Sequence, residues 1–392
     1  MSVSAPGPGR IRPQDARRNA GPSRPPLPGR IRPFRHEDAT EVANLCLRVF
    51  WRSQAPAPPA LASCFTEVFL EHPWFDPELP SRVYIAADGA IRGFAGALPL
   101  HMSYRGRPIR AVVASSIMVE DAKTDPLAGA RLLRAFLQGP QDLSISENAT
   151  DVTRRMWLPF GARTVPLRGL EWMRILRPAG FAAHLVTRRA WPMRLLLAPG
   201  RLLDPVLVRL VRRPAPVPAP EVSGVDVAPE ELAGIILAAL QDYALRPEFD
   251  AATLRWMLLQ AARKERYGSP LARIVSGRGG RPIGGYLGHF RPHGVLRVMQ
   301  VFTAQAHAEA VVDELLSHAW RLGAVAVTGR NQPELMGILQ LRHCLFRHGG
   351  FTLVHSRSPE LLDAVARSEA ILNGLVGEAW ARLNGDSFDR EA

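Results

Sequence analysis

The spacing of apolar and polar residues changes in a regular order along the first half of the chain. Helical segments have apolar residues three and four positions apart, whereas strand segments have short apolar runs bounded by turn residues. The dipeptides Asp88-Gly89 and Arg105-Gly106 separate three strand segments and predict an antiparallel meander. The predicted order is therefore strand, helix, meander, helix, strand and helix. These segments span residues 31–34, 38–50, 81–87, 91–104, 108–119, 127–137, 142–147 and 153–157.

The same order returns in the second half, offset by roughly 190 positions. A strand and a helix follow residue 223, a second meander covers 271–304, and a helix over 308–322 precedes a strand over 324–329. The repeated order indicates an internal duplication. We predict the α/β class, with two units that are each a mixed, mostly antiparallel sheet flanked by helices.

Four regions follow from these patterns. Residues 1–29 alternate proline, glycine and arginine without periodicity, so burial cannot offset their ordering entropy and we expect a disordered tail. Residues 30–165 form the first domain. Residues 166–222 interleave leucine and valine with arginine and end in the stiff run PAPVPAP, which predicts a basic helical linker. Residues 223–392 form the second domain, with a C-terminal helix.

The sequence lacks the marks of a secreted or membrane-spanning protein. No run of about 18 apolar residues free of charge occurs, and the N-terminus has no apolar core typical of a secretion signal. The cysteines are scattered and odd in number, so disulfides are not expected. We therefore expect a reducing, cytoplasmic location.

The formal net charge of +13 raises nucleic acid or an anionic membrane as partners. Lys123 and Lys264 are the only lysines, so the basic residues are nearly all arginines, and several of these lie in the predicted tail. The planar fork of arginine grips phosphate in a bidentate manner. A small phosphate-bearing ligand satisfies this charge as well as a nucleic acid does, and we expect no DNA partner.

The most specific motif is IMVEDAKTDPLAGARLL, residues 117–133. It resembles the GNAT N-acyltransferases, in which the fourth strand ends in an apolar pattern and a loop leads to a helix that starts at small residues. Ile117–Val119 match the strand end, Leu132 and Leu133 match the buried helix positions, and Gly129 matches the last small position. The resemblance implies two GNAT-like domains in tandem.

The resemblance also implies an acyl-CoA co-substrate and the residues that bind it. Main-chain N–H groups at the start of the helix would hold the diphosphate, and donors at the strand end would hold the thioester oxygen and the pantetheine amide. Thr124 stands where the family has Arg or Gln, and Leu127 stands where it has glycine. The implied binding residues are Met118, Val119, Thr124, Leu127, Ala128, Gly129, Ala130 and Arg131.

Acylation of an amine needs a base, and the departing thiolate needs a proton. The family commonly donates that proton from a tyrosine, but the best-matching position here is Trp157, whose indole is no acid near neutral pH. Trp157 is therefore either the altered catalytic position or a core aromatic residue. Glu120 and Glu147 end the fourth and fifth strands, where the family has its base, and each is a candidate base or a solvated charge.

The second half lacks the phosphate motif, because no glycine begins the helix after its meander. It resembles a degenerate GNAT domain that shapes a substrate groove or buries the edge of its partner. His343, Cys344 and His348 match no common zinc spacing, so no metal is expected.

Residues 183–213 set leucines among arginines and resemble a basic helix that lies on anionic lipid. The alternative is a helical strap packed between the domains. Pro192, Pro199 and Pro205 break the segment and favour the strap.

The predicted function is transfer of an acyl group, such as acetyl, from acyl-CoA to an amine, with a small molecule or glycan as acceptor. An amino sugar or a cell-surface precursor is the favoured acceptor class. One alternative is a catalytically inactive GNAT-fold protein used for binding or assembly. Another is a peptidyltransferase that uses aminoacyl-tRNA. The oligomeric state stays open.

Overall fold

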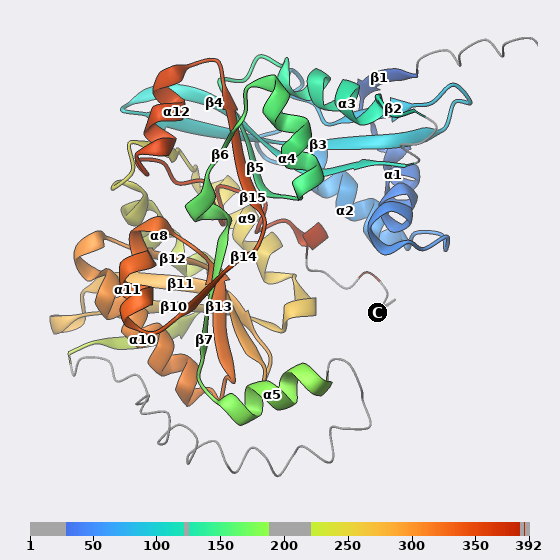
Figure 1. The fold of residues 1–392 in the computed structure, drawn as a ribbon. Coiled ribbons are helices and arrows are strands. Elements are labelled where there is room, and N and C mark those ends of the chain that lie inside the picture. Colours follow the sequence, from blue (N-terminus) through green and yellow to red (C-terminus); the bar gives the residue numbers. More distant parts are fainter. Residues whose placement is uncertain (1–28, 121–124, 188–220, 385–387, 389–392) are drawn as a thin grey trace, which may run out of the picture.

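The computed structural model describes residues 29–120, 125–187, 221–384 and 388. They form two mixed sheets with helices packed on them (Figure 1). In spatial order the first sheet contains β1 (Arg30–Pro33), β2 (Arg82–Ile85), β3 (Ile91–Tyr104), β4 (Arg107–Val119), β5 (Leu143–Ala149), β15 (Phe351–Ser356) and β6 (Arg163–Thr164), with β9 (Leu245–Pro247) attached to β3. The helices on it include α1 (Ala39–Cys46), α2 (Pro59–Phe69), α3 (Ala128–Leu137), α4 (Asp151–Trp157) and α12 (Pro359–Ala366).

The second sheet contains, in spatial order, β14 (Leu345–His348), β7 (Leu170–Ile175), β13 (Ala326–Arg330), β12 (Val295–Thr303), β11 (Pro282–Phe290), β10 (Ser269–Ser276) and β8 (Ser223–Val227). The helices of this half are α5 (Pro178–Thr187), α8 (Ala233–Leu240), α9 (Ala251–Ala262), α10 (Ala308–Arg321) and α11 (Met336–Leu341). In each sheet one strand pair is parallel, β4 with β5 and β12 with β13, and the other pairs are antiparallel. The predicted fold class is therefore confirmed.

The alternation of side chains on β3 explains how helices cover both faces of the first sheet. Phe94 and Leu98 pack with the apolar residues of α1 and α2, and Phe94 makes edge contacts with the rings of Phe65 and Phe69. Ala97 lies on the opposite face, in the cluster formed with α3 and α4. Large residues on one face and small ones on the other let the two helical layers pack at different depths.

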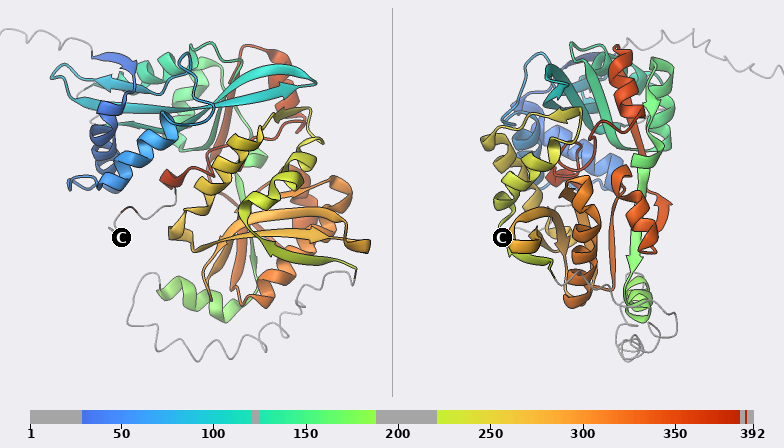
Figure 2. Two further views of the ribbon diagram at one scale, coloured as in Figure 1. Left: turned by 180° about the vertical axis from the view of Figure 1, so that it is seen from behind. Right: turned by 90° about the vertical axis from the view of Figure 1, so that its left-hand side faces the viewer.

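The two halves exchange a strand. β7 follows β6 directly in the chain but lies between β13 and β14, and β15 lies between β5 and β6. Figure 2 shows β7, in green, leaving the first sheet and entering the second. Residues 170–175, which we placed in the linker, are thus an interior strand of the second sheet. No single cut of the chain separates the sheets, so the boundaries expected at 165 and 222 do not separate them.

The connection from β6 to β7 and the connection from β14 to β15 cross at glycines. The N–H groups of Gly349 and Gly350 donate to the carbonyl of Gly169 at 3.0 and 3.3 Å. A Cβ on Gly169 would lie 2.3 Å from the carbonyl oxygen of Gly350. The crossing therefore requires residues without side chains, because the two backbones touch.

Some expectations fall outside the described residues. These are the tail up to residue 28, Thr124, and residues 188–213 of the segment expected to contact a membrane. Within the described ranges, no helix combines the length and the apolar character needed to cross a membrane.

Buried His72 predicts acid-sensitive stability. Its ring contacts Trp256 and Trp380, and its Nδ1 accepts the N–H of Trp74 at 2.9 Å. Burial, aided by the electrostatic effect of the neighbouring His101, lowers the pKa of His72 to about 4. The unfolded chain takes up this proton near pH 6.5, so the free energy of unfolding falls as pH drops from 6.5 to 4, by about 3 kcal/mol from this group.

Urea titrations of the H72Q variant between pH 7 and 4 test this expectation. The variant should lose less stability than the wild type over that range, whereas H307Q, at an exposed position, should follow the wild type. Equal pH dependence in H72Q and the wild type would contradict it.

Candidate functional site

Strands β4 and β5 diverge within the first sheet. They pair in parallel at three positions, the last being Val113 with Ile145, and both strands continue beyond that point without pairing to each other. A cavity of about 320 Å³ opens between the diverging ends, and we call it the β4–β5 cleft. The strand residues that line the cleft are Ala114, Ser116 and Ile117 on β4 and Ser146, Asn148 and Ala149 on β5.

A bulge in β4 sets which residues reach the cleft. The register of β4 against β3 shifts at this point, and Ser116 takes a positive φ of 52°. Met118 lies beyond the bulge, buried and paired with Phe94. Met118 and Val119, which we expected to present main-chain donors, do not line the cleft, and Ser116 and Ile117 take that place.

The cleft has a polar wall and an apolar wall. Asn148, Thr150 and Thr153 lie where β5 runs into α4. The apolar wall comes from the end of α1 and the π-helical turn after it, with Cys46, Phe50 and Trp51. Burial raises the pKa of the Cys46 thiol to about 12, so this thiol is no nucleophile near neutral pH. The two walls suit a ligand that combines amide groups with an apolar chain.

The predicted phosphate site is the N-terminus of α3. Leu127 is 64% exposed and does not fill the bend. The N–H groups of Gly129 and Ala130 have no hydrogen-bond acceptor among the described residues, which leaves them available to an anion. A Cβ on Gly129 would lie 2.9 Å from Cε of Met156, so its small size also serves the packing of α3 on α4.

An acidic residue shares this helix end. The Asp125 carboxylate accepts the N–H of Leu127 at 3.2 Å and bonds the Tyr84 hydroxyl and the Arg131 guanidinium. The hydrogen bond from Tyr84 and the charge of Arg131 hold the pKa of Asp125 below its usual value. Asp125 is therefore ionised near neutral pH and opposes a phosphate at α3. Arg131, one of the predicted binding residues, is paired with it.

Two predicted catalytic residues lie away from the cleft. Glu120 forms a two-point ion pair with Arg48, at 2.7 and 3.0 Å. Trp157 is fully buried, packs against Phe136, and its indole N–H has no partner in the described structure. The position of Glu120 does not fit its expected role as a base, and the position of Trp157 does not fit a catalytic role. Trp157 fits the alternative, a core aromatic residue.

Glu147 is an anchor for the C-terminal segment. Its buried carboxylate accepts the N–H groups of Gly374 at 2.9 Å, Glu378 at 2.7 Å and Ala379 at 3.0 Å. A Cβ on Gly377 would lie 2.0 Å from the same carboxylate, so glycine is needed for this approach. With both oxygens engaged, Glu147 is not placed to act as the expected base.

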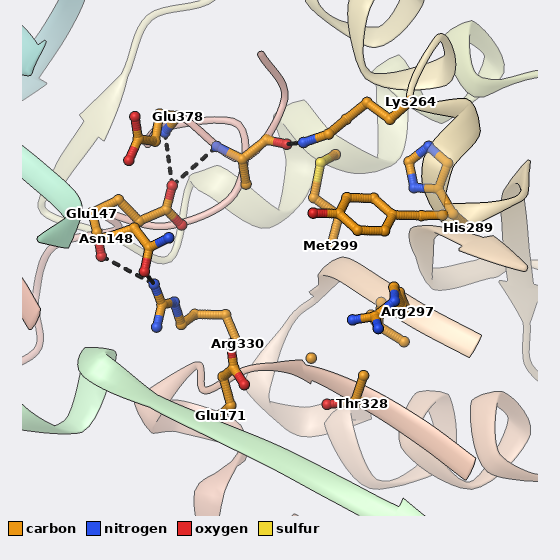
Figure 3. Close-up of a pocket in the computed structure, with 14 residues that line it drawn as sticks. Glu147, Asn148, Glu171, Lys264, His289, Arg297, Met299, Thr328, Arg330 and Glu378 are labelled. Carbon is orange, nitrogen blue, oxygen red and sulfur yellow. Dashed lines mark hydrogen bonds between the residues drawn. The ribbon is translucent and has the colours of Figure 1, made fainter. Parts of the chain in front are cut away.

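The anchored segment runs between the two halves and separates two cavities. The second cavity, of about 300 Å³, lies between β5, the second sheet and residues 378–379, and we call it the interdomain cavity (Figure 3). Asn148 and Glu378 line both cavities. In Figure 3 the carboxylate of Glu378 lies on the side away from Lys264 and His289. Glu378 thus stands at the junction between the cleft and the interdomain cavity.

In the second sheet, a side chain bonds to the main chain at the point where the corresponding strands, β12 and β13, stop pairing. β12 and β13 pair in parallel up to Val298 and Gly329. Beyond that point the Gln332 carboxamide accepts the N–H of Val301 at 2.8 Å and donates to its carbonyl at 2.9 Å. This edge therefore has its main-chain groups satisfied, which agrees with the absence of a phosphate motif in the second half.

The described ranges contain no group of three or more His, Cys, Asp or Glu residues arranged to hold a metal ion. Cys344 lies between His343 and His348 in the sequence. Burial raises the pKa of its thiol to about 12.

Sequence reasoning missed the contribution of the C-terminal segment. Glu378 reaches the site from 231 positions beyond Glu147. The only local signal was the pair Gly374 and Gly377, which marks a tight approach but not its partner. Asn148 stood between a predicted strand and a predicted helix, and no periodic pattern distinguished it.

Comparison with known proteins supports the fold. Neither protein-family models nor curated sequences give a match to this chain. A GCN5-related N-acetyltransferase from Anabaena variabilis aligns with a TM-score of 0.55 at 12% identity, covering 84% of this chain and 72% of that one. A conserved protein of unknown function from Enterococcus faecalis, a probable N-acyltransferase, aligns with a TM-score of 0.54 at 10% identity, covering 84% of this chain and 72% of that one.

A GCN5-related N-acetyltransferase from Kribbella flavida gives a TM-score of 0.51 at 10% identity, over 84% of this chain and 71% of that one. At these identities the likeness concerns the fold. The mixed sheets, the divergence of β4 from β5 and the small-residue start of α3 agree with it. The chain therefore consists of two domains of the GNAT fold in tandem, the fold of the GCN5-related N-acetyltransferases.

Proposed function

We propose that the protein transfers an acyl group from acyl-CoA to an amine in the β4–β5 cleft. The observation that supports this is the cavity between the diverging strands, together with the N–H groups of Gly129 and Ala130 at the helix that follows β4, which have no acceptor among the described residues. The helix end would hold the diphosphate, and the edge of β4 at Ser116 and Ile117 would hold the pantetheine and the thioester.

The amine enters from the junction with the interdomain cavity. Its nitrogen attacks the thioester carbonyl carbon, an N–C bond forms, and the C–S bond breaks. Before the attack, Glu378 accepts one proton from the ammonium form of the amine, which frees the nitrogen lone pair. The second proton leaves the nitrogen as the amide forms and passes through water to the CoA thiolate, and Glu378 then releases its proton to the solvent. The products are the amide and free CoA. Glu378 is assigned this role because its position at the junction borders both cavities.

Binding of acetyl-CoA tests the proposal. We expect acetyl-CoA to raise the Tm of the full chain, since it binds the folded state alone. Replacing Thr153 by tryptophan fills the cleft and should abolish that shift. Val152, its neighbour on α4, is 68% exposed and does not line the cleft, so V152W should keep the shift. An acetyl-CoA shift of equal size in T153W and V152W would contradict the proposed site.

The charge at α3 gives a second prediction. Replacing Asp125 by asparagine removes a negative charge next to the diphosphate site but keeps an acceptor for the N–H of Leu127. We expect D125N to bind acetyl-CoA several-fold more tightly at low ionic strength, with the gain shrinking as salt is added. Isothermal titration measures this, and unchanged or weaker binding would place the diphosphate elsewhere.

The same residue favours one alternative function. An ionised Asp125 at the helix end suits a GNAT-fold protein that no longer uses CoA and serves for binding or assembly. Absence of any acetyl-CoA shift in both the wild type and D125N would favour that function. The aminoacyl-tRNA alternative has less support, because the longest helix among the described residues of the second half, α10, has only 14 residues, which is too short for a long helical arm.

A further inference from the structure

The wall of the β4–β5 cleft contains residues from both helical layers of the first sheet. Thr150 and Thr153, at the start of α4, line one part of it. Cys46, Phe50 and Trp51, at the end of α1 and in the π-helical turn after it, line another part. Helices α4 and α1 pack on opposite faces of the sheet. A ligand that fills the cleft therefore extends between the strands from one face of the sheet to the other.

The two ends of the cleft would receive different parts of an acyl-CoA. Helix α3 follows β4 in the chain and packs on the same face as α4. In the proposed function, the N–H groups of Gly129 and Ala130 hold the diphosphate on this face, and the pantetheine lies along β4 at Ser116 and Ile117. The acyl group then points to the other face, towards the end of α1.

That end of the cleft has an apolar wall. The C-terminal segment contributes to it, because the turn Arg382–Asn384 contacts α2 and Leu383 packs on the core beneath α1 and α2. The charged residues that line the cleft are Glu378, at the junction with the interdomain cavity, and Arg266, which is exposed. The apolar residues at the α1 end are Cys46, Phe50, Trp51 and Leu383.

Two aromatic side chains of this wall are open to solvent. Phe50 is 51% exposed and Trp51 is 43% exposed. Both belong to the π-helical turn Leu47–Trp51, which ends at Arg52 with a positive φ of 53°. Turns of this kind are rare and occur often at functional sites. Covering these rings with a hydrocarbon removes apolar surface of both partners from water, which favours binding.

We propose that the acyl group is a hydrocarbon chain longer than acetyl, which lies against Phe50 and Trp51. The cavity of about 320 Å³ also has to hold the end of the pantetheine, so we expect a chain of medium length, about six carbons. This inference rests on the proposed function, because the direction of the acyl group follows from CoA bound at α3. It adds the class of acyl group that the cleft prefers.

A comparison of two thioesters tests the preference. Isothermal titration of the full chain measures the affinities for acetyl-CoA and hexanoyl-CoA, which differ by four methylene groups. Each methylene that leaves water tightens binding by up to about four-fold, and we expect hexanoyl-CoA to bind at least about ten-fold more tightly. A smaller difference, or tighter binding of acetyl-CoA, would overturn the proposal.

Variants locate the contact. F50S/W51S removes the aromatic surface and should lower the ratio of the hexanoyl-CoA to the acetyl-CoA affinity at least about five-fold, whereas F50L/W51L keeps an apolar wall and should keep most of the ratio. Phe75 is a matched control, because it is 42% exposed and does not line the cleft, so F75S should keep the wild-type ratio. A wild-type ratio in F50S/W51S, or an equal fall in F75S, would overturn the assignment.

Acetyl-CoA binding keeps the two proposals apart. If acetyl-CoA and hexanoyl-CoA bind equally well, the chain preference fails and the acyltransferase proposal stands. If neither thioester binds, the proposed function fails, and the chain preference fails with it. Titration with hexylamine covers the other use of an apolar wall. Binding of hexylamine that is lost in F50S/W51S, with equal binding of the two thioesters, would assign the wall to the acceptor and overturn the proposal.

Discussion

Replacing Glu378 by glutamine is expected to lower kcat/KM for acyl transfer by about 10²- to 10⁴-fold near neutral pH, the usual contribution of a positioned base. Glutamine has nearly the same shape but cannot take a proton from the amine. The loss should shrink as pH rises towards the pKa of the free acceptor, because the amine then arrives without its extra proton. Release of the CoA thiol, followed from pH 6 to 10, measures both effects.

A structural effect of the Glu378 substitution would look different. The main-chain N–H of Glu378 bonded to Glu147 is unchanged in E378Q, so acetyl-CoA binding and Tm should stay close to the wild type. E360Q, on an exposed residue of α12, serves as the control and should keep full activity. If E378Q keeps wild-type activity across the pH range, Glu378 is not the base.

Replacing Glu147 by alanine should be the most destabilising of these changes. Two buried main-chain donors, on Gly374 and Glu378, and a partly buried one on Ala379 lose their acceptor, and each unsatisfied buried donor costs about 1–3 kcal/mol. We expect a loss of at least about 3 kcal/mol in the free energy of unfolding, measured by urea titration. The freed C-terminal segment should also be cut by trypsin at Arg382 before the rest of the chain unfolds.

The matched control is Glu171, also a strand carboxylate near the interdomain cavity. It pairs at the surface with Arg347, so E171A should cost less than about 1 kcal/mol. If E147A and E171A lose similar amounts of stability, the C-terminal segment is held mainly by other contacts, such as that of Leu375 with Gln300.

The amino-acid sequence was enough to predict most elements of both halves, the mixed sheets and the β4 to α3 unit with Gly129. These features depend on apolar spacing and turn residues over short stretches, and such local patterns do not depend on residues elsewhere in the chain. The bulge at Ser116 could not be predicted from the sequence. Because of this bulge, Ser116 and Ile117 line the cleft in place of Met118 and Val119. A bulge depends on how β3 and β4 pair, which no local pattern records.

The partners of the site residues can be identified only in the folded chain. Glu147 reads as a strand-end charge, and its role as an anchor depends on main-chain N–H groups that lie more than 220 positions further along the chain. The same holds for Glu378 at the cleft, Gln332 in the closed second sheet, and the exchange of β7 and β15. Contacts between distant segments have no periodicity in the sequence, because they are specified by the packing of both halves together.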